Sequence, residues 1–274
     1  MKKPIGIVLI NYFNDDEVIS FISNQLRKQT EEEIQVYVLD NGSDNNELKV
    51  FCESERAIKY YKPGNNLGYI GGFLHVIDSL KSLGPGKIIL SNTDIEIDTD
   101  LLERIGAYEL NKDEVMLGPD LISTRTHHSQ NPFYEHRISE SKLRMLNFVF
   151  SSWLTYSAYK VLGIMKAGIK GKTKKKVETG VRPVYAIHGS FMIFKTSFVE
   201  TYSAELHDAP FLFGEELRFA ETALKHHLQI LYCPQFKINH HEHATTQLFR
   251  SGKMLKHLKN SIDFFLKKRM EEKA

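Results

Sequence analysis

Acidic side chains directly follow predicted buried strands at two points in the chain. The segment KIILSNTDIEID carries Asp94 just after an apolar strand, and VLDNGSDN ends another strand in Asp40. Mg²⁺ or Mn²⁺ prefers oxygen ligands and often takes one or two protein carboxylates beside water and substrate phosphate. Asp94 is the predicted metal ligand, because Asp98 and Asp100 are better placed for the alternative role of helix cap. Asp40 could accept a hydrogen bond from a base or ribose, although Asp-Asn-Gly-Ser is also good turn chemistry.

A pair of glutamates opens a predicted helix in the segment APFLFGEELRFAETALKHH. Glu215 and Glu216 follow an aromatic loop there. Acidic residues in a first turn are stabilised by the helix dipole, which accounts for them without catalysis. A carboxylate held at a pocket could instead act as a general base, because partial burial raises its pKa toward working pH. The segment alone leaves both interpretations open.

Histidines end the late strand of FKINHHEHATT. Alternation along a strand sends His240 and His241 to opposite faces, so one of them could ligate a metal. A lone histidine is more often structural. The spacing also differs from HExxH, so zinc proteolysis is not indicated.

Glycines cluster around the start of another predicted helix, in KPGNNLGYIGGF. Gly64, Gly68, Gly71 and Gly72 would allow close approach of a ligand, and a helix N-terminus favours anions such as diphosphate. The spacing is neither GxGxxG nor that of a P-loop, which weakens dinucleotide and ATP binding as explanations. Tight packing of the helix on a strand is the alternative.

Short apolar stretches alternate with helix-length segments through the first 120 residues. The predicted strands there are Ile5–Ile10, Ile34–Leu39, Ile58–Tyr61, Ile88–Leu90 and Val115–Leu117. Further on, we expect strands over Tyr185–Phe194, Gln229–Tyr232 and Phe236–Asn239, and helices over Glu215–His227 and Lys253–Lys268. This order predicts an α/β fold with a mostly parallel sheet and helices on both faces. Ligands of such sheets bind beyond the carboxyl ends of the strands.

Composition excludes several other classes of protein. The 274 residues are 42% hydrophobic and 26% charged, with a net charge of +2, which is typical of a globular protein and not of a polyanion binder. Cys52 and Cys233 match no metal or redox spacing, which favours a reducing compartment. The apolar stretch after the first lysines is too short for a signal peptide, and no stretch reaches spanning length. We therefore expect a cytoplasmic enzyme.

Taken in order, seven segments resemble the motifs of family 2 glycosyltransferases, especially rhamnosyltransferase-like enzymes of bacterial surface polysaccharide synthesis. They are IGIVLINYFN, VYVLDNGSDN, NNLGYIGGF, IILSNTDIEID, IHGSFMIFKTSF, FLFGEEL and CPQFKINHH. The resemblance covers most of the chain and implies the GT-A fold, which has a Rossmann-like central sheet, in a transferase domain over 1–245. The residue pattern itself predicts a helical, basic insertion at 139–180 and a C-terminal basic amphipathic helix over 246–274.

The resemblance also implies roles for particular residues in an inverting transfer from a nucleotide-diphosphate sugar. Glu216 would be the catalytic base, with Glu215 adjacent to it in the family's acidic pair. Asp94 and His240 would hold a divalent cation, Mn²⁺ or Mg²⁺, and Asn92 stands where the family often has a first aspartate. The residues implied at the donor are Asn11, Asp40, Asn66, Gly68, Gly71 and Asn92.

The segment Arg144–Lys176 combines an aromatic, apolar stretch with the lysine-rich sequence KAGIKGKTKKK. This composition is typical of an interfacial helix attracted to anionic lipid. It suggests peripheral contact with the inner face of the cell membrane, where a polyprenyl-diphosphate-linked saccharide acceptor would lie. The alternative is a helical hairpin that covers the acceptor side, with its lysines solvated.

Other functions fit the sequence less well. A catalytically weak glycosyltransferase-like scaffold or carbohydrate-binding protein is the main alternative, and hydrolysis of a sugar donor would separate the two. INYFNDDE lacks the glycine-rich, basic motif of nucleotidyltransferases. No recognition motif accompanies the lysines, so we do not expect nucleic-acid binding. The sequence does not determine the oligomeric state.

Overall fold

The computed structural model describes residues 4–30, 33–43, 46–80, 86–169, 180–242 and 252–273, and only the backbone of 163–169 and 252. The strands are β1 (Ile5–Asn11), β2 (Ile34–Asp40), β3 (Ile58–Tyr61), β4 (Lys87–Ser91), β5 (Ile95–Ile97), β6 (Glu114–Ser123), β7 (Arg182–Val184), β8 (Phe191–Lys195) and β9 (Gln229–His240). The helices are α1 (Asp15–Phe21), η1 (Ile22–Leu26), α2 (Glu47–Ser54), α3 (Gly68–Ser79), α4 (Leu101–Ala107), α5 (Glu140–Val149), α6 (Trp153–Ile169), α7 (Thr196–Leu206), α8 (Glu215–Lys225) and α9 (Gly252–Glu271). The chain therefore alternates strands and helices as expected.

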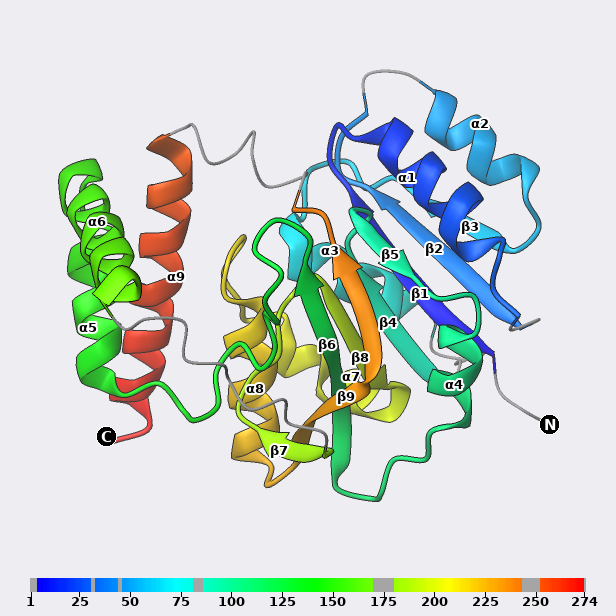
Figure 1. The fold of residues 1–274 in the computed structure, drawn as a ribbon. Coiled ribbons are helices and arrows are strands. Elements are labelled where there is room, and N and C mark those ends of the chain that lie inside the picture. Colours follow the sequence, from blue (N-terminus) through cyan, green and yellow to red (C-terminus); the bar gives the residue numbers. More distant parts are fainter. Residues whose placement is uncertain are drawn as a thin grey trace.

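All strands belong to one sheet of order β3-β2-β1-β4-β8-β6-β9-β5, with β7 also paired to β9. The first four of that order are parallel. Beyond β4 the sheet is mixed, because β8 runs antiparallel to both β4 and β6, while β6 and β9 are parallel. The first half thus forms the expected parallel sheet, and the second half reverses direction around β8 (Figure 1).

Alternating residues of the central strands supply two apolar cores, one on each face of the sheet. In β1, Val8 packs with residues of α3, α7 and α8, whereas Ile7 and Leu9 pack with residues of α1, α2 and α4. This period of two is what a strand covered on both faces requires. The sheet is therefore packed on both faces, which defines where its strand ends lie.

A third, smaller cluster joins the helices α5 and α9 to α8. Leu143 and Leu146 of α5 pack with Ile262 and Phe265 of α9 and with Leu217 of α8. In Figure 1, α5, α6 and α9 stand beside the sheet as a separate helical layer. The predicted helical insertion is therefore a hairpin as far as Ile169, and the lysines from Lys170 to Lys176 lie outside the described residues.

Two details differ from the expected elements. The strand expected over Tyr185–Phe194 begins only at Phe191, because the preceding residues form a turn. The two strands expected between Gln229 and Asn239 are one strand, β9, with a register shift against β6 near Cys233. A bulge interrupts the alternation of buried and exposed residues there, so the sequence pattern suggests two separate strands.

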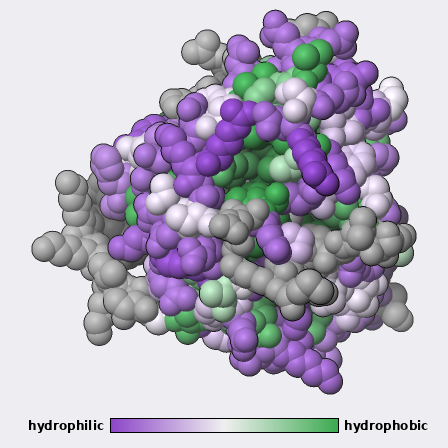
Figure 2. Space-filling view, turned by 90° about the vertical axis from the view of Figure 1, so that its right-hand side faces the viewer, coloured by the Kyte–Doolittle hydropathy of each residue, from purple (hydrophilic) through white to green (hydrophobic). Residues whose placement is uncertain are grey.

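The face seen from the right-hand side of Figure 1 is mainly hydrophilic, with apolar side chains visible in a central hollow (Figure 2). Among the described helices, none is both long enough and apolar enough to cross a membrane.

Candidate active site

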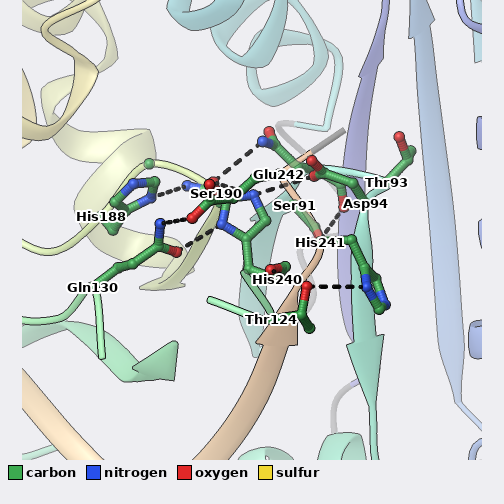
Figure 3. A network of polar contacts seen from close by, with 12 residues as sticks. Ser91, Thr93, Asp94, Thr124, Gln130, His188, Ser190, His240, His241 and Glu242 are labelled. Atoms are coloured by element: carbon green, nitrogen blue, oxygen red, sulfur yellow. Dashed lines mark hydrogen bonds and ion pairs between the residues drawn. The ribbon is translucent and has the colours of Figure 1, made fainter. Parts of the chain in front are cut away.

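Strand pairing brings Asp94 and His240 together, although they lie far apart in the sequence. The chain leaves β4 at Ser91, passes Asp94 and enters β5, where Ile95 pairs with His240 of β9. Asp94 and His240 are both buried, and Asp94 Oδ1 lies 3.4 Å from His240 Nε2. The main chain also joins the two segments, because His241 N donates a hydrogen bond to the carbonyl oxygen of Asp94 at 2.9 Å. The two predicted metal ligands are therefore neighbours (Figure 3).

Two residues behind His240 determine which ring nitrogen faces Asp94. Gln130 Nε2 donates to Glu242 Oε1 at 2.9 Å, so the oxygen of this amide points to His240 Nδ1, 2.7 Å away. A carbonyl oxygen only accepts, and Nδ1 must therefore carry a hydrogen. In neutral His240 the lone pair then lies on Nε2, toward Asp94 (Figure 3). A metal-binding histidine is normally oriented in this way by its second nitrogen.

The donor set fits a divalent cation that also needs substrate oxygens. One carboxylate and one imidazole lie 3.4 Å apart, and no group of three or more His, Cys, Asp or Glu side chains suited to a metal occurs among the described residues. Mg²⁺ in phosphate-transfer enzymes is commonly bound through one or two carboxylates, with substrate phosphate and water as the remaining ligands. Asp94 and His240 would hold such an ion.

His241 points away from this pair, as the alternation predicts. Its Nδ1 lies 3.4 Å from Thr124 Oγ1, and its Nε2 lies 3.7 Å from Glu96 Oε2. His243 lies outside the described residues. Of the two described histidines considered from the sequence, His240 is the one that lies beside Asp94.

The turn before β8 connects Asp94 and His240 to the glutamates of α8. Ser190 Oγ lies 3.3 Å from His240 Nε2 and accepts a hydrogen bond from Asn92 Nδ2 at 3.2 Å. Asn92 Oδ1 in turn accepts from the hydroxyl of Tyr69 at 3.0 Å. That hydroxyl also lies 3.2 Å from the carbonyl oxygen of Gly189. Asn92 thus serves as a bridge in the site, not as a second acidic ligand.

Glu216 and Glu215 both lie against Gly189. The backbone N–H of Gly189 donates to Glu216 Oε1 at 3.1 Å, and a Cβ built at Gly189 would lie 2.9 Å from the same oxygen and 3.0 Å from Glu215 Oε1. Burial, and then the charge of Glu215, raise the pKa of Glu216 well above that of an ordinary glutamate. Burial also raises the pKa of Glu215. A carboxylate with a raised pKa at a site of this kind is suited to accept a proton.

His188, in the same turn, is a neutral neighbour of the pair. Burial, and then the nearby His240, lower the pKa of His188 to about 4. Its Nδ1 accepts a hydrogen bond from the backbone N–H of Ser190 at 3.2 Å. His188 therefore adds no positive charge beside His240 at neutral pH and stabilises the turn instead.

Asp40 and Asn11 form a second polar cluster at the ends of β2 and β1, where they are register partners. Asp40 is buried; its Oδ1 accepts from Asn11 and Ser43, and its Oδ2 from Tyr60 and Lys62. Burial opposes ionisation, but the hydrogen bonds led by Tyr60 outweigh it and hold the pKa of Asp40 below its usual value. Asp40 is therefore a fixed negative charge at this strand end.

The glycine-rich segment is held against both clusters. Asn41 Oδ1 accepts from Leu67 N and its Nδ2 donates to the carbonyl oxygen of Gly68, each at 2.9 Å. Gly68 has a φ of +75°, and a Cβ there would clash with the carbonyl oxygen of Phe211. Asn66 Oδ1 accepts from Gly68 N at 2.8 Å. A glycine is therefore required where the start of α3 meets the loop before α8.

The other two predicted glycine contacts differ from each other. A Cβ at Gly72 would meet Leu39 and Ile10 side chains, so this glycine allows α3 to pack on the sheet. A Cβ at Gly71 would lie 3.5 Å from Leu67 Cβ, which is an ordinary contact. The packing explanation considered from the sequence therefore applies to Gly72, whereas Gly71 leaves its helix face open.

Helix α1 joins the Asp40 cluster to Asp94. Asn11 Oδ1 accepts from Asn14 N at 3.1 Å, Asn14 hydrogen bonds to Glu17, and Glu17 Oε2 accepts from Thr93 Oγ1 at 3.0 Å. A polar cavity of about 190 Å³ opens beside Asp94 between these elements. Its lining includes Glu17, Ser20, Asn24, Gln25, Thr93, Asp94 and His241.

Sequence reasoning missed several residues that shape the site, among them Tyr69, Gln130, Ser190 and Glu242. Tyr69 and Ser190 stand inside segments that the sequence had marked, NNLGYIGGF and IHGSF. Gln130 and Glu242 carried no signal, because their role depends on which strand lies beside His240.

Several solved structures have a fold similar to that of this chain. GalNAc-T7, solved with UDP, GalNAc and Mn²⁺, matches over 87% of this chain and 44% of its own, at 12% identity and a TM-score of 0.56. S. aureus TarS with UDP-GlcNAc matches over 90% and 61%, at 11% identity and a TM-score of 0.55. The mannosyltransferase PcManGT of Pyrobaculum calidifontis, with GDP-Man and Mn²⁺, matches over 97% and 70%, at 11% identity and a TM-score of 0.55.

The fold is that of the GT-A glycosyltransferases. The chain spans less than two thirds of the length of the GalNAc-T7 and TarS structures. No known sequence family matches it, and no curated protein sequence does. The expected fold is therefore confirmed by structure alone.

Proposed function

We propose that this protein is a glycosyltransferase that moves a sugar from a nucleotide-diphosphate sugar to a saccharide or lipid-linked saccharide acceptor. The observation that carries the proposal is the convergence of Asp94, His240 and Glu216 on the turn 188–190. Two side chains suited to hold one cation and a carboxylate with a raised pKa meet there within the GT-A fold. The similar structures contain UDP, UDP-GlcNAc or GDP-Man, two of them with Mn²⁺, and they support this donor class.

Asp94 and His240 would hold Mn²⁺ or Mg²⁺, which neutralises charge on the departing diphosphate when it is bound. Asp40 and Asn11 would contact the nucleoside. Both of the Asp40 oxygens already accept hydrogen bonds, so a nucleoside must displace one of these partners, and half-exposed Lys62 is the easiest to move. Asn66, Gly68, Gly71 and Asn92 would lie along the rest of the donor.

Glu216 is the proposed base. It would accept the proton of the acceptor hydroxyl as that oxygen attacks the anomeric carbon from the side opposite the leaving group, which inverts the configuration. Gly189 N–H orients the carboxylate for this step, and Glu215 tunes its pKa. On the motif resemblance, the protein would be a family 2, rhamnosyltransferase-like enzyme of surface polysaccharide synthesis in the bacterial cytoplasm, with a transferase domain over 1–245 and a C-terminal segment 246–274 that contains α9.

Calorimetry of the protein against UDP, dTDP and GDP, each with and without Mn²⁺, tests the donor site. We expect one nucleotide to bind, and more tightly with Mn²⁺. No binding of any of the three would contradict the proposed donor site and favour a scaffold role.

Two substitutions test the assignment of the site. Asp94→Ala removes a cation ligand and Glu216→Gln removes the base, and each is expected to lower transfer by about 10²–10⁴-fold with an unchanged circular dichroism spectrum. Glu216→Gln should keep its nucleotide affinity, whereas Asp94→Ala should lose the enhancement by Mn²⁺. Transfer at the wild-type rate by both variants would overturn the assignment.

A further inference from the structure

The hairpin of α5 and α6 exposes an unusual amount of apolar surface. Seven of the large hydrophobic side chains that are exposed lie between residues 145 and 162: Met145, Phe148, Trp153, Leu154, Tyr159, Val161 and Leu162. Leu154 is 80% exposed and Phe148 is 67% exposed. Single exposed apolar residues are ordinary, but a contiguous group of them marks an interaction surface.

These exposed residues do not belong to the side of the hairpin that packs into the core. The opposite side of α5 buries Leu143, Leu146 and Val149, and the first two pack with Ile262 and Phe265 of α9. The hairpin is therefore anchored by one side, while its other side and most of α6 up to Leu162 face outward. In Figure 1 this layer stands at the end of the molecule away from β2 and β3.

A cavity of about 540 Å³ lies where the α5–α6 turn meets the start of α9. Phe150, Trp153 and Leu255 supply its apolar lining, and Ser151, Ser152, Lys256 and Lys259 supply its polar lining. Hydroxyl and ammonium groups beside aromatic surface suit a phosphate attached to an apolar chain.

Charge distinguishes between the possible occupants of this surface. Residues 150–162 and 253–262 contain four lysines and no aspartate or glutamate. Lys259 pairs with Asp263 at 2.7 Å, whereas exposed Lys256 makes no ion pair or hydrogen bond with the residues that the structure describes. A second copy of the same surface would bring like charges together. An anionic bilayer attracts the lysines and accepts the apolar side chains.

We propose that α5, α6 and the start of α9 form a docking surface for an anionic lipid bilayer. Phe148, Trp153 and Leu154 enter the interface, and Lys256 and Lys259 contact lipid phosphate at the cavity. This contact is separate from the nucleotide site, so it holds or fails independently of the proposed transfer reaction.

The chain contains one tryptophan, Trp153, so its fluorescence reports on this surface directly. The probes are vesicles of phosphatidylcholine alone and of phosphatidylcholine with phosphatidylglycerol in equal parts. With the anionic vesicles we expect a blue shift of the emission, quenching by lipids brominated in their acyl chains, and co-sedimentation of the protein. An unchanged spectrum with both kinds of vesicle would overturn the proposal.

Four variants distinguish binding through this surface from nonspecific adsorption to vesicles. Leu154→Gln is expected to weaken binding to anionic vesicles by about tenfold or more, because one side chain no longer enters the apolar layer. Lys256→Gln should weaken it by about fivefold. The matched controls are Val50→Gln on α2 and Lys267→Gln at the far end of α9, which are also exposed and should bind like wild type. Equal loss in the controls would contradict the assignment of the surface.

Two further outcomes would also reject a membrane as the occupant. A stable dimer in light scattering, converted to monomer by Leu154→Gln, would assign the surface to a second copy. A Trp153 shift with soluble glycerol phosphate as large as that with vesicles would assign the cavity to a free phosphate. All four variants should keep wild-type nucleotide affinity, so loss of donor binding and loss of membrane binding are distinguishable.

Discussion

At the scale of single residues, the site depends on groups that orient the proposed ligands and base. Gln130 and Glu242 set the tautomer of His240, and Gly189 holds Glu216. None of these three residues performs chemistry in the proposed mechanism. Each controls a direction or a protonation state, and each can therefore be tested with a measurement other than overall activity.

Replacing Gln130 tests the orientation of His240. Gln130→Ala removes the acceptor for Nδ1–H, so both the ring and the position of its hydrogen are no longer defined. We expect the affinity for Mn²⁺ in the presence of nucleotide to fall by about 10–100-fold, measured by calorimetry. Gln229→Ala, at the opposite and exposed end of β9, is the control and should leave the affinity unchanged. Wild-type affinity in Gln130→Ala would show that His240 needs no such support.

Replacing Glu215 tests the electrostatic coupling of the glutamate pair. The charge of Glu215 is the second cause of the raised pKa of Glu216, so Glu215→Gln should lower that pKa. A base is active when ionised, and the acidic limb of the profile of kcat/KM against pH should therefore move to lower pH. Glu200→Gln, on the exposed side of α7, should leave the profile in place. A limb that does not move would mean that the two carboxylates do not interact.

At the scale of elements, α9 links the insertion to the proposed base. Gly214, at the N-terminus of α8 with a φ of +120°, lies against Ser261 and Phe265 of α9. Phe265 also packs with Leu143 and Leu146 of α5. The C-terminal helix therefore stabilises both the hairpin and the turn from which Glu215 and Glu216 project.

Truncation of Phe265 tests this link. Phe265 is buried, and Phe265→Ala should lower the free energy of unfolding by about 3–5 kcal/mol, measured by urea denaturation. Transfer should fall as well, because the N-terminus of α8 loses its packing. Met270→Ala, an exposed position on the same helix, should change stability by less than about 0.5 kcal/mol. Little loss of stability in Phe265→Ala would indicate that α9 docks only weakly.

At the scale of the whole molecule, the partly buried glutamates Glu215 and Glu216 make the stability of the protein depend on pH. A carboxyl whose pKa is raised by folding binds its proton more tightly in the folded state than in the unfolded chain. Its contribution is complete below the unfolded pKa of about 4.3 and is lost as pH rises through the folded pKa. The site therefore costs stability at neutral pH, as functional sites often do.

Glu216→Gln tests this cost. Since glutamine has no charge to bury, the variant should have a higher Tm than wild type at pH 8, and the difference should disappear toward pH 4. Scanning calorimetry at several pH values measures it. Glu200→Gln again supplies an exposed control, with no pH-dependent difference expected. A lower Tm for Glu216→Gln at every pH would mean that the ionised carboxylate is stabilised by the site.

The amino-acid sequence by itself determined the α/β alternation, the strand ends that carry Asp40 and Asp94, and the motif order that resembles GT-A enzymes. These features are local: strand periodicity, turn residues and helix starts depend on neighbours a few residues away. For that reason the expected strands β1 to β4 match the structure closely, and Ile58–Tyr61 matches it in full.

Only the tertiary structure decided which of these residues meet. Asp94 and His240 are adjacent because β5 pairs with β9, and Glu216 reaches Gly189 because the chain turns before the antiparallel strand β8. Gln130 lies 110 positions from His240, a separation over which no local pattern carries information. Strand order and direction follow from packing of the entire sheet, and they convert scattered polar residues into one site.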